Sequence, residues 1–150
     1  MREIHSLTDL KALIGQEVAV SDWVEISQER VNTFAAATGD HQWLHVDVER
    51  ANRESPFKGP IAHGFLTLSL LPMLMENAIH MSDVNIGVNY GLNKVRFPAP
   101  VLVGSKLRAH FKLLEVEDIS GGAQMIWEVK IEREGSDKPV CVAESIMLRY

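Results

Sequence analysis

The stretch GFLTLSLLPMLMENAIH, residues 64–80, is the most apolar part of the chain and predicts a buried helix. Its apolar residues occupy nearly every face of a helix, which is typical of an element enclosed by the rest of a protein. A membrane span is the competing interpretation, but Pro72, Glu76 and Asn77 interrupt a run that is shorter than the roughly 20 residues a bilayer requires. Because Pro72 has no N–H group to bond the carbonyl of Leu68, we expect a bend in this helix.

The chain after this helix alternates apolar and polar side chains, which predicts strands separated by turns. The expected strands cover residues 85–97, 106–116, 125–132 and 140 to the C-terminus. Gly121 and Gly122 predict a hairpin turn between the second and the third of them. One face of the last strand is expected to carry Val140, Val142, Ile146 and Leu148. Consecutive strands should pair antiparallel.

The residues before the helix predict one more strand and two further helices. Valine and isoleucine alternate with other residues from 18 to 26, which favours a half-buried strand. Ser27 is a suitable N-cap for a helix that Gly39 would end. Asp47 can cap a second, short helix that would stop before Pro56.

This order of elements predicts an α+β fold, in which an antiparallel five-stranded sheet wraps around a long central helix. At 150 residues the chain is expected to form a single domain, residues 1–150. A five-stranded sheet leaves edge strands without partners. We therefore expect a homodimer or a larger even-numbered oligomer.

Composition narrows the classes of protein. Hydrophobic residues make up 46% of the chain and charged residues 23%, which is ordinary for a globular protein. A formal net charge of -5 argues against a nucleic-acid partner, and no membrane partner is expected. Cys141, the only cysteine, is expected to be a buried structural thiol in a reducing compartment. Because the N-terminus lacks an apolar core of signal-peptide length, a cytoplasmic location is expected.

Polar, ionisable residues gather in two segments ahead of the apolar helix. The first is Asp40-His41-Gln42-Trp43-Leu44-His45, between the two predicted helices, and the second is Ala62-His63-Gly64. We expect the first segment to be a loop, where functional side chains are often held. Asp40 and His45 are the main candidates, because a carboxylate and an imidazole within hydrogen-bond reach can transfer protons near neutral pH.

Three motifs resemble one known family: ATGDHQWLHVD at 37–47, GPIAHGF at 59–65, and VRFPAPV at 95–101 followed by Gly104. In this order and spacing they are similar to the MaoC-like family of R-specific enoyl-CoA hydratases, which have the hotdog fold, and most similar to its NodN-like branch. The resemblance implies hydration of a trans-2-enoyl-CoA to an (R)-3-hydroxyacyl-CoA, or the reverse, with Asp40 and His45 as catalytic residues. The family usually has Asn-Pro where this sequence has Gln42-Trp43.

Four further residues have expected roles around this pair. Gly64 opens the buried helix, where a free N–H group can stabilise an enolate oxygen, and a role in tight packing is compatible with this. His63 is expected to orient the loop, and the Gln42 amide to help hold the substrate or the loop. Ser69 matches a polar position on the family's helix. A bond near the catalytic pair and a bond within its own helix are both open for Ser69.

Other chemistries remain as alternatives. Residues of metal-ligand type are Asp40, His41, His45, Asp47 and His63. Their spacing matches no known metal motif, so we expect no metal and no cofactor, with coenzyme A only as part of the substrate. Lys94 and Arg96 could meet its phosphates, although Arg96 could equally be a structural ion-pair partner. An acyl-CoA thioesterase and a non-catalytic protein that binds acyl thioesters are the competing functions.

Overall fold

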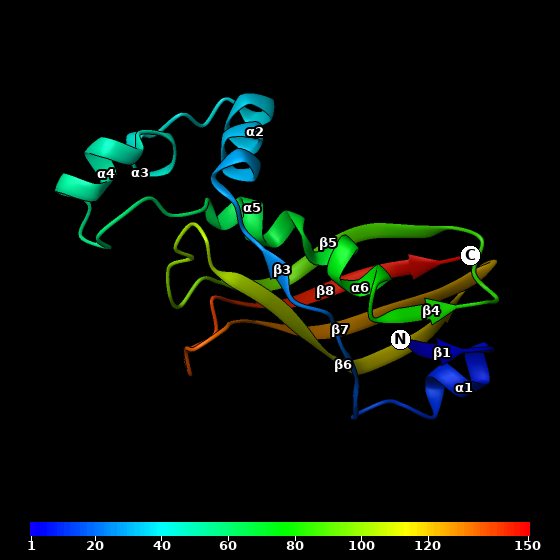
Figure 1. Ribbon diagram of the computed structural model, residues 1–150. Coiled ribbons are helices and arrows are strands. Elements are labelled where there is room, and N and C mark those ends of the chain that lie inside the picture. Colours follow the sequence, from blue (N-terminus) through cyan, green and yellow to red (C-terminus); the bar gives the residue numbers. More distant parts are fainter.

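The computed structural model describes all residues from Met1 to Tyr150, and its main element is an antiparallel sheet that packs against two short helices (Figure 1). The strand order is β2-β6-β7-β8-β5, and β3 also pairs with β6. The strands are β2 (Glu17–Val20), β3 (Val24–Glu25), β5 (Gly87–Arg96), β6 (Lys106–Ile119), β7 (Gly122–Arg133) and β8 (Cys141–Arg149). The antiparallel α+β arrangement expected from the sequence is confirmed. No helix is both long enough and apolar enough to span a membrane.

Two short strands, β2 and β3, pair with β6 at one edge of the sheet, where the sequence predicts a single strand over 18–26. Ser21 is buried at the break, and its N–H donates to the carbonyl of Ala109 at 2.9 Å. The Ser21 hydroxyl accepts from the N–H of Ala109 at 2.8 Å, so a side chain replaces the usual backbone acceptor. Regular pairing resumes at Val24, opposite Leu107. The sheet therefore has six strands in five positions.

The apolar stretch forms two helices, so the expectation of one long helix over residues 64–80 was wrong. The helices α5 (Gly64–Ser69) and α6 (Leu71–Glu76) have six residues each and meet at Leu70. Pro72 lies in the first turn of α6, where its missing N–H group breaks no intrahelical bond. The expected bend is present, but as a complete break between α5 and α6 just before this proline.

A separate parallel pair, β1 (Arg2–Ile4) and β4 (Ile79–Met81), lies at the end of the molecule that also carries α1 (Leu7–Lys11) (Figure 1). This pair was not predicted, because the predicted apolar helix includes residues 79 and 80, which belong to β4. A three-residue strand has too few positions to show an alternating pattern.

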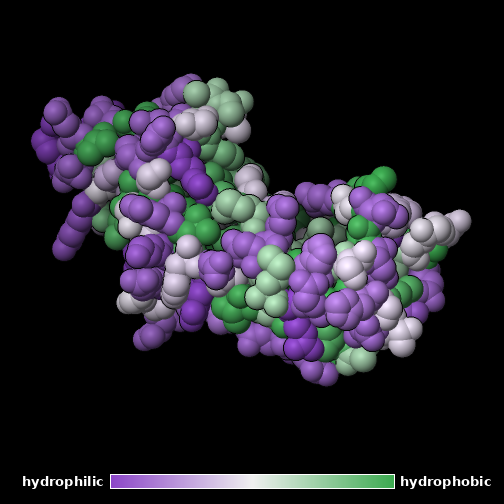
Figure 2. All heavy atoms as spheres, turned by 45° about the vertical axis from the view of Figure 1, so that its right-hand side comes forward, coloured by the Kyte–Doolittle hydropathy of each residue, from purple (hydrophilic) through white to green (hydrophobic).

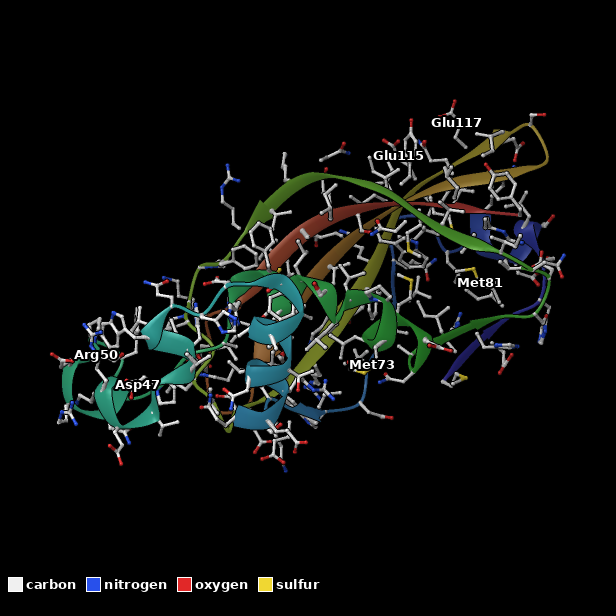
Figure 3. All side chains as sticks on the ribbon, turned by 90° about the horizontal axis from the view of Figure 1, so that it is seen from above. Asp47, Arg50, Met73, Met81, Glu115 and Glu117 are labelled. Carbon is white, nitrogen blue, oxygen red and sulfur yellow. The ribbon has the colours of Figure 1, made fainter.

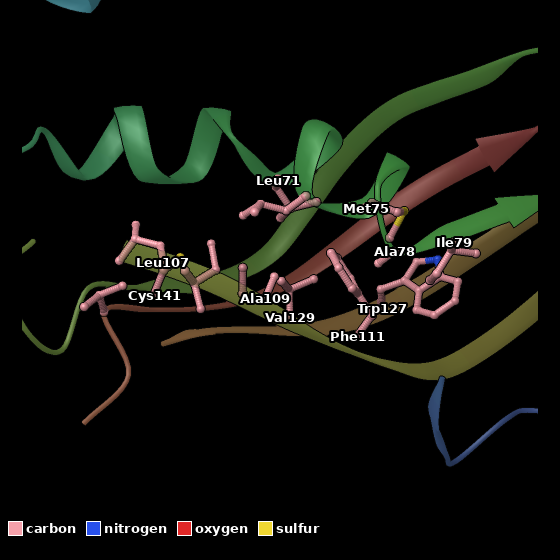
Figure 4. Packing of buried hydrophobic residues seen from close by; sticks show 14 of the residues in the cluster. Leu71, Met75, Ala78, Ile79, Leu107, Ala109, Phe111, Trp127, Val129 and Cys141 are labelled. Atoms are coloured by element: carbon pink, nitrogen blue, oxygen red, sulfur yellow. The ribbon is translucent and has the colours of Figure 1, made fainter. Parts of the chain in front are cut away.

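The two helices cover one face of the sheet and form the core with it. Leu71, Met75 and Ala78 lie on the helical side, facing the side chains of β6 and β7 (Figure 4). Among the latter, the rings of Phe111 and Trp127 meet edge-on with centroids 6.5 Å apart, and both are fully buried. This layer fixes where α5 begins, and hence where Gly64 and its neighbours stand.

In β8, the face turned toward the core is opposite to the one expected. The buried residues in the first part of the strand are Cys141, Ala143 and Ser145, whereas Val142, Ile146 and Leu148 are half-buried. Val140, just before the strand, is buried as expected. Both faces of this strand carry apolar residues, so alternation alone could not distinguish them. Burial raises the pKa of the Cys141 thiol to about 11, which agrees with the expected structural role.

Residues 28–54 form an arm that extends from the sheet (Figures 1 and 2). Its helices are α2 (Gln28–Thr38), α3 (Trp43–Val46) and α4 (Val48–Glu54). The predicted caps are confirmed: the Ser27 hydroxyl accepts from the N–H of Arg30, Gly39 ends α2 with φ of 84°, and the Asp47 carboxylate accepts from the N–H of Arg50. Seen from above, Arg50 on the arm and Glu117 on the sheet lie at opposite ends of the molecule (Figure 3).

Candidate functional site

Three ionisable side chains converge where the arm meets the start of α5. They are Asp40, His45 and His63, and each offers one nitrogen or oxygen atom within 4.8 Å of the others. Asp40 directly follows the residue that ends α2, His45 lies on α3, and His63 is the N-cap of α5. The structure therefore brings together both segments that the sequence analysis singled out.

His45 sits in a one-turn helix, so the expectation of a loop was wrong for residues Trp43–Val46. His45 is buried, with 7% exposure, although its polar surroundings in the sequence predict an exposed position. The Nδ1 atom lies 2.7 Å from the carbonyl oxygen of Ile61. Because a carbonyl only accepts hydrogen bonds, Nδ1 carries the hydrogen, and the Nε2 atom of the neutral ring keeps a free lone pair.

His63 is in contact with both other members of the cluster and is 3% exposed. Its Nε2 atom lies 3.0 Å from the backbone carbonyl oxygen of Asp40, which fixes the hydrogen on Nε2. Its ring stacks on that of His45, with centroids 3.8 Å apart and planes at 26°, and also packs against Phe34. The buried Nδ1 atom of His63 has no hydrogen-bond partner. These contacts hold the other two residues and leave no exposed ring atom for substrate.

Asp40 is the exposed member of the cluster. Its side chain is 53% exposed, and Oδ2 lies 4.0 Å from Nε2 of His63. Its Oδ1 atom accepts a weak hydrogen bond of 3.3 Å from the N–H of Gln42, which tightens the turn into α3. The Gln42 side-chain amide does not cap that helix. The carboxylate therefore faces solvent beside two buried imidazoles.

Gly64 has a packing role that is visible in the structure. A Cβ atom at this position would lie 3.1 Å from two carbons of the Phe97 ring, so the ring covers the space that a side chain would occupy. Gly64 and Phe97 line one cavity of about 400 Å³ together with Phe57, Ile61 and Thr67. The N–H of Gly64 is the first of α5 and has no acceptor within the helix.

Ser69 lies apart from the cluster. Its hydroxyl donates to the carbonyl of Phe65 in its own helix at 2.6 Å, which is one of the two possibilities left open by the sequence. Its side chain borders a second cavity of about 320 Å³, which also takes in Asn89 and Ser145. Neither Asp40, His45 nor His63 lines that cavity.

The cluster also has the atom types of a metal site, with one possible ligand atom from each residue within 4.8 Å of the others. Two imidazoles and a carboxylate are common ligands of zinc, which requires them to converge tetrahedrally. Here the two imidazole rings stack with their planes at 26°, which is not the usual arrangement of two ligands on a tetrahedral ion. The Nδ1 atom of His45 and the Nε2 atom of His63 bond backbone carbonyls, which leaves one nitrogen on each ring without a protein partner. The expectation of no metal therefore stays a prediction.

Two partners of His45 were missed by sequence reasoning. They are the carbonyl of Ile61, which accepts from the ring, and the side chain of Gln28, whose Nε2 atom donates to the His45 carbonyl at 2.7 Å. Both contacts join residues at least 16 positions apart. A glutamine in the first turn of a helix and a carbonyl outside regular structure carry no sequence pattern, so only the fold reveals them.

The sheet packed on α5 and α6, together with an arm that carries a paired carboxylate and imidazole, defines a hotdog protein. The family described as MaoC like domain matches residues 9–134, and the chain belongs to that family. A Mycobacterium tuberculosis protein named 3-hydroxyacyl-thioester dehydratase Z is 56% identical over 151 residues, covering 100% of this chain and 99% of its own. Nodulation protein N of Rhizobium leguminosarum is 42% identical over 95% of this chain and 90% of its own.

A solved structure supports the fold independently. The R-hydratase PhaJ1 from Pseudomonas aeruginosa matches 91% of this chain and 81% of its own length, with a TM-score of 0.74 and 23% sequence identity. The family and the hotdog fold expected from the three sequence motifs are therefore confirmed.

Proposed function

We propose that this protein adds water to a trans-2-enoyl thioester to give the (R)-3-hydroxyacyl thioester, and also catalyses the reverse dehydration. Membership of the MaoC-like family and 56% identity to a protein named as a 3-hydroxyacyl-thioester dehydratase support a hydro-lyase. The R configuration is the one implied by the family resemblance and by the name of the R-hydratase of similar fold.

The proposal rests on the hydrogen bond between Nδ1 of His45 and the carbonyl oxygen of Ile61. With Nδ1–H donating to that carbonyl, the Nε2 atom of His45 is the free base of the ring, and one nitrogen of this ring lies within 4.8 Å of an Asp40 carboxylate oxygen. A water molecule bound between them gives a proton to Nε2 as its oxygen attacks C3 of the enoyl group. Asp40 accepts the second hydrogen of the water in a hydrogen bond and stabilises the imidazolium that forms.

The electrons of the C2–C3 double bond move to the thioester oxygen, giving an enolate, and C2 then takes the proton from His45. One water is added and no group is oxidised or reduced. The N–H of Gly64 stabilises the enolate oxygen, a kind of contact that contributes about 2.7 to 4 kcal/mol in comparable sites. Gln42, whose side-chain amide is free of the helix cap, remains a candidate contact for the substrate. Ser69 remains a weaker one, because its hydroxyl is engaged within its helix.

The thioester carrier is proposed to be coenzyme A, without any resident cofactor. Lys94 is 75% exposed and makes only a long ion pair of 3.9 Å with Glu144, so it is free to meet a phosphate. The Arg96 guanidinium donates to the carbonyl of Val95, and it has no carboxylate partner. These two cations on β5 are the candidate phosphate contacts. A reducing, cytoplasmic location is consistent with the single buried cysteine.

A homodimer formed through β5 is also proposed. This edge strand leaves large apolar side chains in solvent, among them Tyr90 with 64% exposure, and Ile86 just before the strand has 58%. Phe65 at the start of α5 is 71% exposed. Pairing of two β5 edges would cover unpaired backbone groups and these side chains together. A monomer mass at micromolar concentration in light scattering would contradict it.

The test of the function is incubation with crotonyl-CoA, followed through the absorbance of the enoyl thioester and the chirality of the product. Loss of absorbance with formation of (R)-3-hydroxybutyryl-CoA is expected. Release of free thiol would indicate a thioesterase instead. A ligand-dependent rise in Tm without turnover would indicate a protein that only binds acyl thioesters.

A further inference from the structure

The side chain of Gln28 is hydrogen-bonded to the backbone of His45, although Gln28 has no part in the proposed proton transfers. Its Nε2 atom donates to the His45 carbonyl at 2.7 Å and to Oδ1 of Asn32 at 2.9 Å, so both amide hydrogens are used. Its Oε1 atom is buried without a hydrogen-bond partner. Turning the amide over would place oxygen against the His45 carbonyl, so this carbonyl alone determines the orientation.

The reason lies in the shortness of α3. A helix of four residues cannot be stable alone, and its last carbonyls have no N–H donors within the helix. The N–H of Asp47 donates to the carbonyl of Trp43. The N–H of Ile61 donates to the carbonyl of Leu44 at 3.0 Å. Of the four carbonyls of α3, those of His45 and Val46 are left, and Gln28 bonds the carbonyl of His45 from α2.

We infer that Gln28 is a positioning residue, which holds His45 at the place and angle where its ring can bond Ile61 and present Nε2 to substrate. The inference rests on the proposed function, since it matters only if His45 transfers protons. Without the Gln28 amide, α3 keeps its tie through Leu44, but the backbone of His45 is free to shift, and its ring no longer meets the Ile61 carbonyl in one fixed geometry. A displacement of about 1 Å at a reacting group can cost about 10²-fold in rate.

The test compares two substitutions at this position with a matched glutamine elsewhere. Gln28→Leu removes the donor together with the unpartnered buried oxygen, and Gln28→Glu keeps the shape but replaces the donor with an acceptor. Gln16→Leu is the control, because the Gln16 amide also bonds a backbone carbonyl, that of Ala12, but far along the chain from His45. We expect kcat on crotonyl-CoA to fall about tenfold to a hundredfold in both Gln28 variants, with KM within about twofold.

A second readout does not depend on turnover. Imidazole ¹⁵N spectra distinguish a ring with hydrogen on Nδ1 from a mixture of tautomers, and His45 is assigned by its absence in His45→Asn. We expect His45 to change from the Nδ1–H form to a mixture in Gln28→Leu and to stay unchanged in Gln16→Leu.

Three results overturn the inference: kcat within about twofold of the unaltered protein in either Gln28 variant, a fall matched by Gln16→Leu, or a His45 that keeps its Nδ1–H form. If Gln28 has a purely structural role, its substitution would lower Tm and leave kcat per folded molecule unchanged. If Gln28→Leu does not fold, Gln28→Glu carries the same comparison. Failure of the unaltered protein to hydrate any enoyl thioester would overturn the proposed function alone, because the tautomer measurement would still report on Gln28.

Discussion

His45 in the arm and His110 on β6 are both engaged by hydrogen bonds, but with opposite consequences. The His45 ring donates from Nδ1 to a backbone carbonyl and keeps Nε2 free. The His110 ring has a carboxylate at each nitrogen, Glu17 at Nδ1 and Glu132 at Nε2. Glu132 is also bonded by Arg108 at 2.8 Å. The difference between the two histidines lies in their partners and not in their own chemistry.

Both ring nitrogens of His110 are engaged with carboxylates, so neither is available to a substrate. This residue ties three strands together at the surface. The cavity beside it measures about 630 Å³, more than the 400 Å³ beside Gly64, yet none of its lining residues is hydrophobic. Cavity size would therefore select His110, whereas the count of free ring nitrogens selects His45, the residue of the proposed mechanism.

The largest expected effect comes from the free nitrogen of His45 and from Asp40. His45→Asn retains an N–H donor for the Ile61 carbonyl but has no counterpart of Nε2, and Asp40→Asn loses the charge. Each should lower kcat for hydration by about 10² to 10⁴ with little change in KM, because general acid–base groups contribute that much. The double variant should be little worse than the worse single one, since the two groups act as a unit.

The matched control for that prediction is His110→Asn, which removes an imidazole whose two nitrogens are both bonded to carboxylates. Its kcat should equal that of the unaltered protein. Near-normal kcat in Asp40→Asn or His45→Asn would exclude the pair as the catalytic machinery. Loss of the circular dichroism spectrum in both would mean that the residues are structural.

A smaller effect is expected at His63, where stacking and hydrogen bonding can be separated. His63→Phe keeps a ring beside His45 and loses the donor to the Asp40 carbonyl, while His63→Gln keeps a donor and loses the ring. We expect kcat to fall about tenfold in His63→Phe and clearly less in His63→Gln, because release of Asp40 misplaces the carboxylate. Steady-state kinetics at saturating substrate would measure both, and the reverse order would show that stacking matters more.

Gly64→Ala tests the contact with Phe97. The added methyl group would lie 3.1 Å from the ring, which is close enough to force a shift. We expect a loss of about 1 kcal/mol in the free energy of unfolding, typical of overpacking, together with a reduced kcat. Adding Phe97→Leu should restore stability. Recovery of stability without recovery of kcat would show that the methyl group also obstructs the enolate position.

The smallest effect is expected at Glu132, on the structural side of the comparison. Burial raises the pKa of this carboxyl, but the hydrogen bonds from His110 and Arg108 and their charges outweigh it, so the pKa is lowered from 4.5. A lowered pKa contributes stability that is present above 4.5 and is lost as pH falls through the folded-state value. Glu132→Gln should therefore destabilise the protein by less than about 1 kcal/mol at neutral pH.

Urea denaturation at several pH values would measure this effect. The difference between Glu132→Gln and the unaltered protein should shrink as pH falls below 4.5, and kcat at neutral pH should not change. A gap in stability that is constant with pH would show that the ionised form of Glu132 has no special partners.

Much of the fold could be predicted because its signals are local. Alternation places β6 and β7 correctly, and cap residues such as Ser27 and Asp47 mark where helices begin. The errors fall where a tertiary contact decides: Ser21 divides a strand by bonding Ala109, and β8 presents the face that its register with β7 requires. Neither contact leaves a pattern within a short window of sequence.

The site shows the same division. Asp40, His45 and His63 could be selected from residue type and motif spacing, and the structure places them together. That His45 is buried, and which of its nitrogens is free, depends on a carbonyl at Ile61 that any residue type could supply. Residue identity thus predicts which groups are present. Only the fold determines their tautomers and their supports.

The carbonyl of Ile61 is itself held by a part of the chain that is synthesised later. Ile61 forms a β-bridge with Leu102, the N–H of Ala62 donates to the carbonyl of Val101 at 2.8 Å, and the N–H of Val103 donates to the carbonyl of Pro60 at 3.0 Å. Chains emerge from the ribosome N-terminal end first, at about 5–20 residues per second. Asp40, His45 and His63 are therefore made seconds before the segment that holds Ile61. In the nascent chain the proposed catalytic groups are present without their supports, and His45 gains the partner that defines its tautomer only once the region around Leu102 has been made.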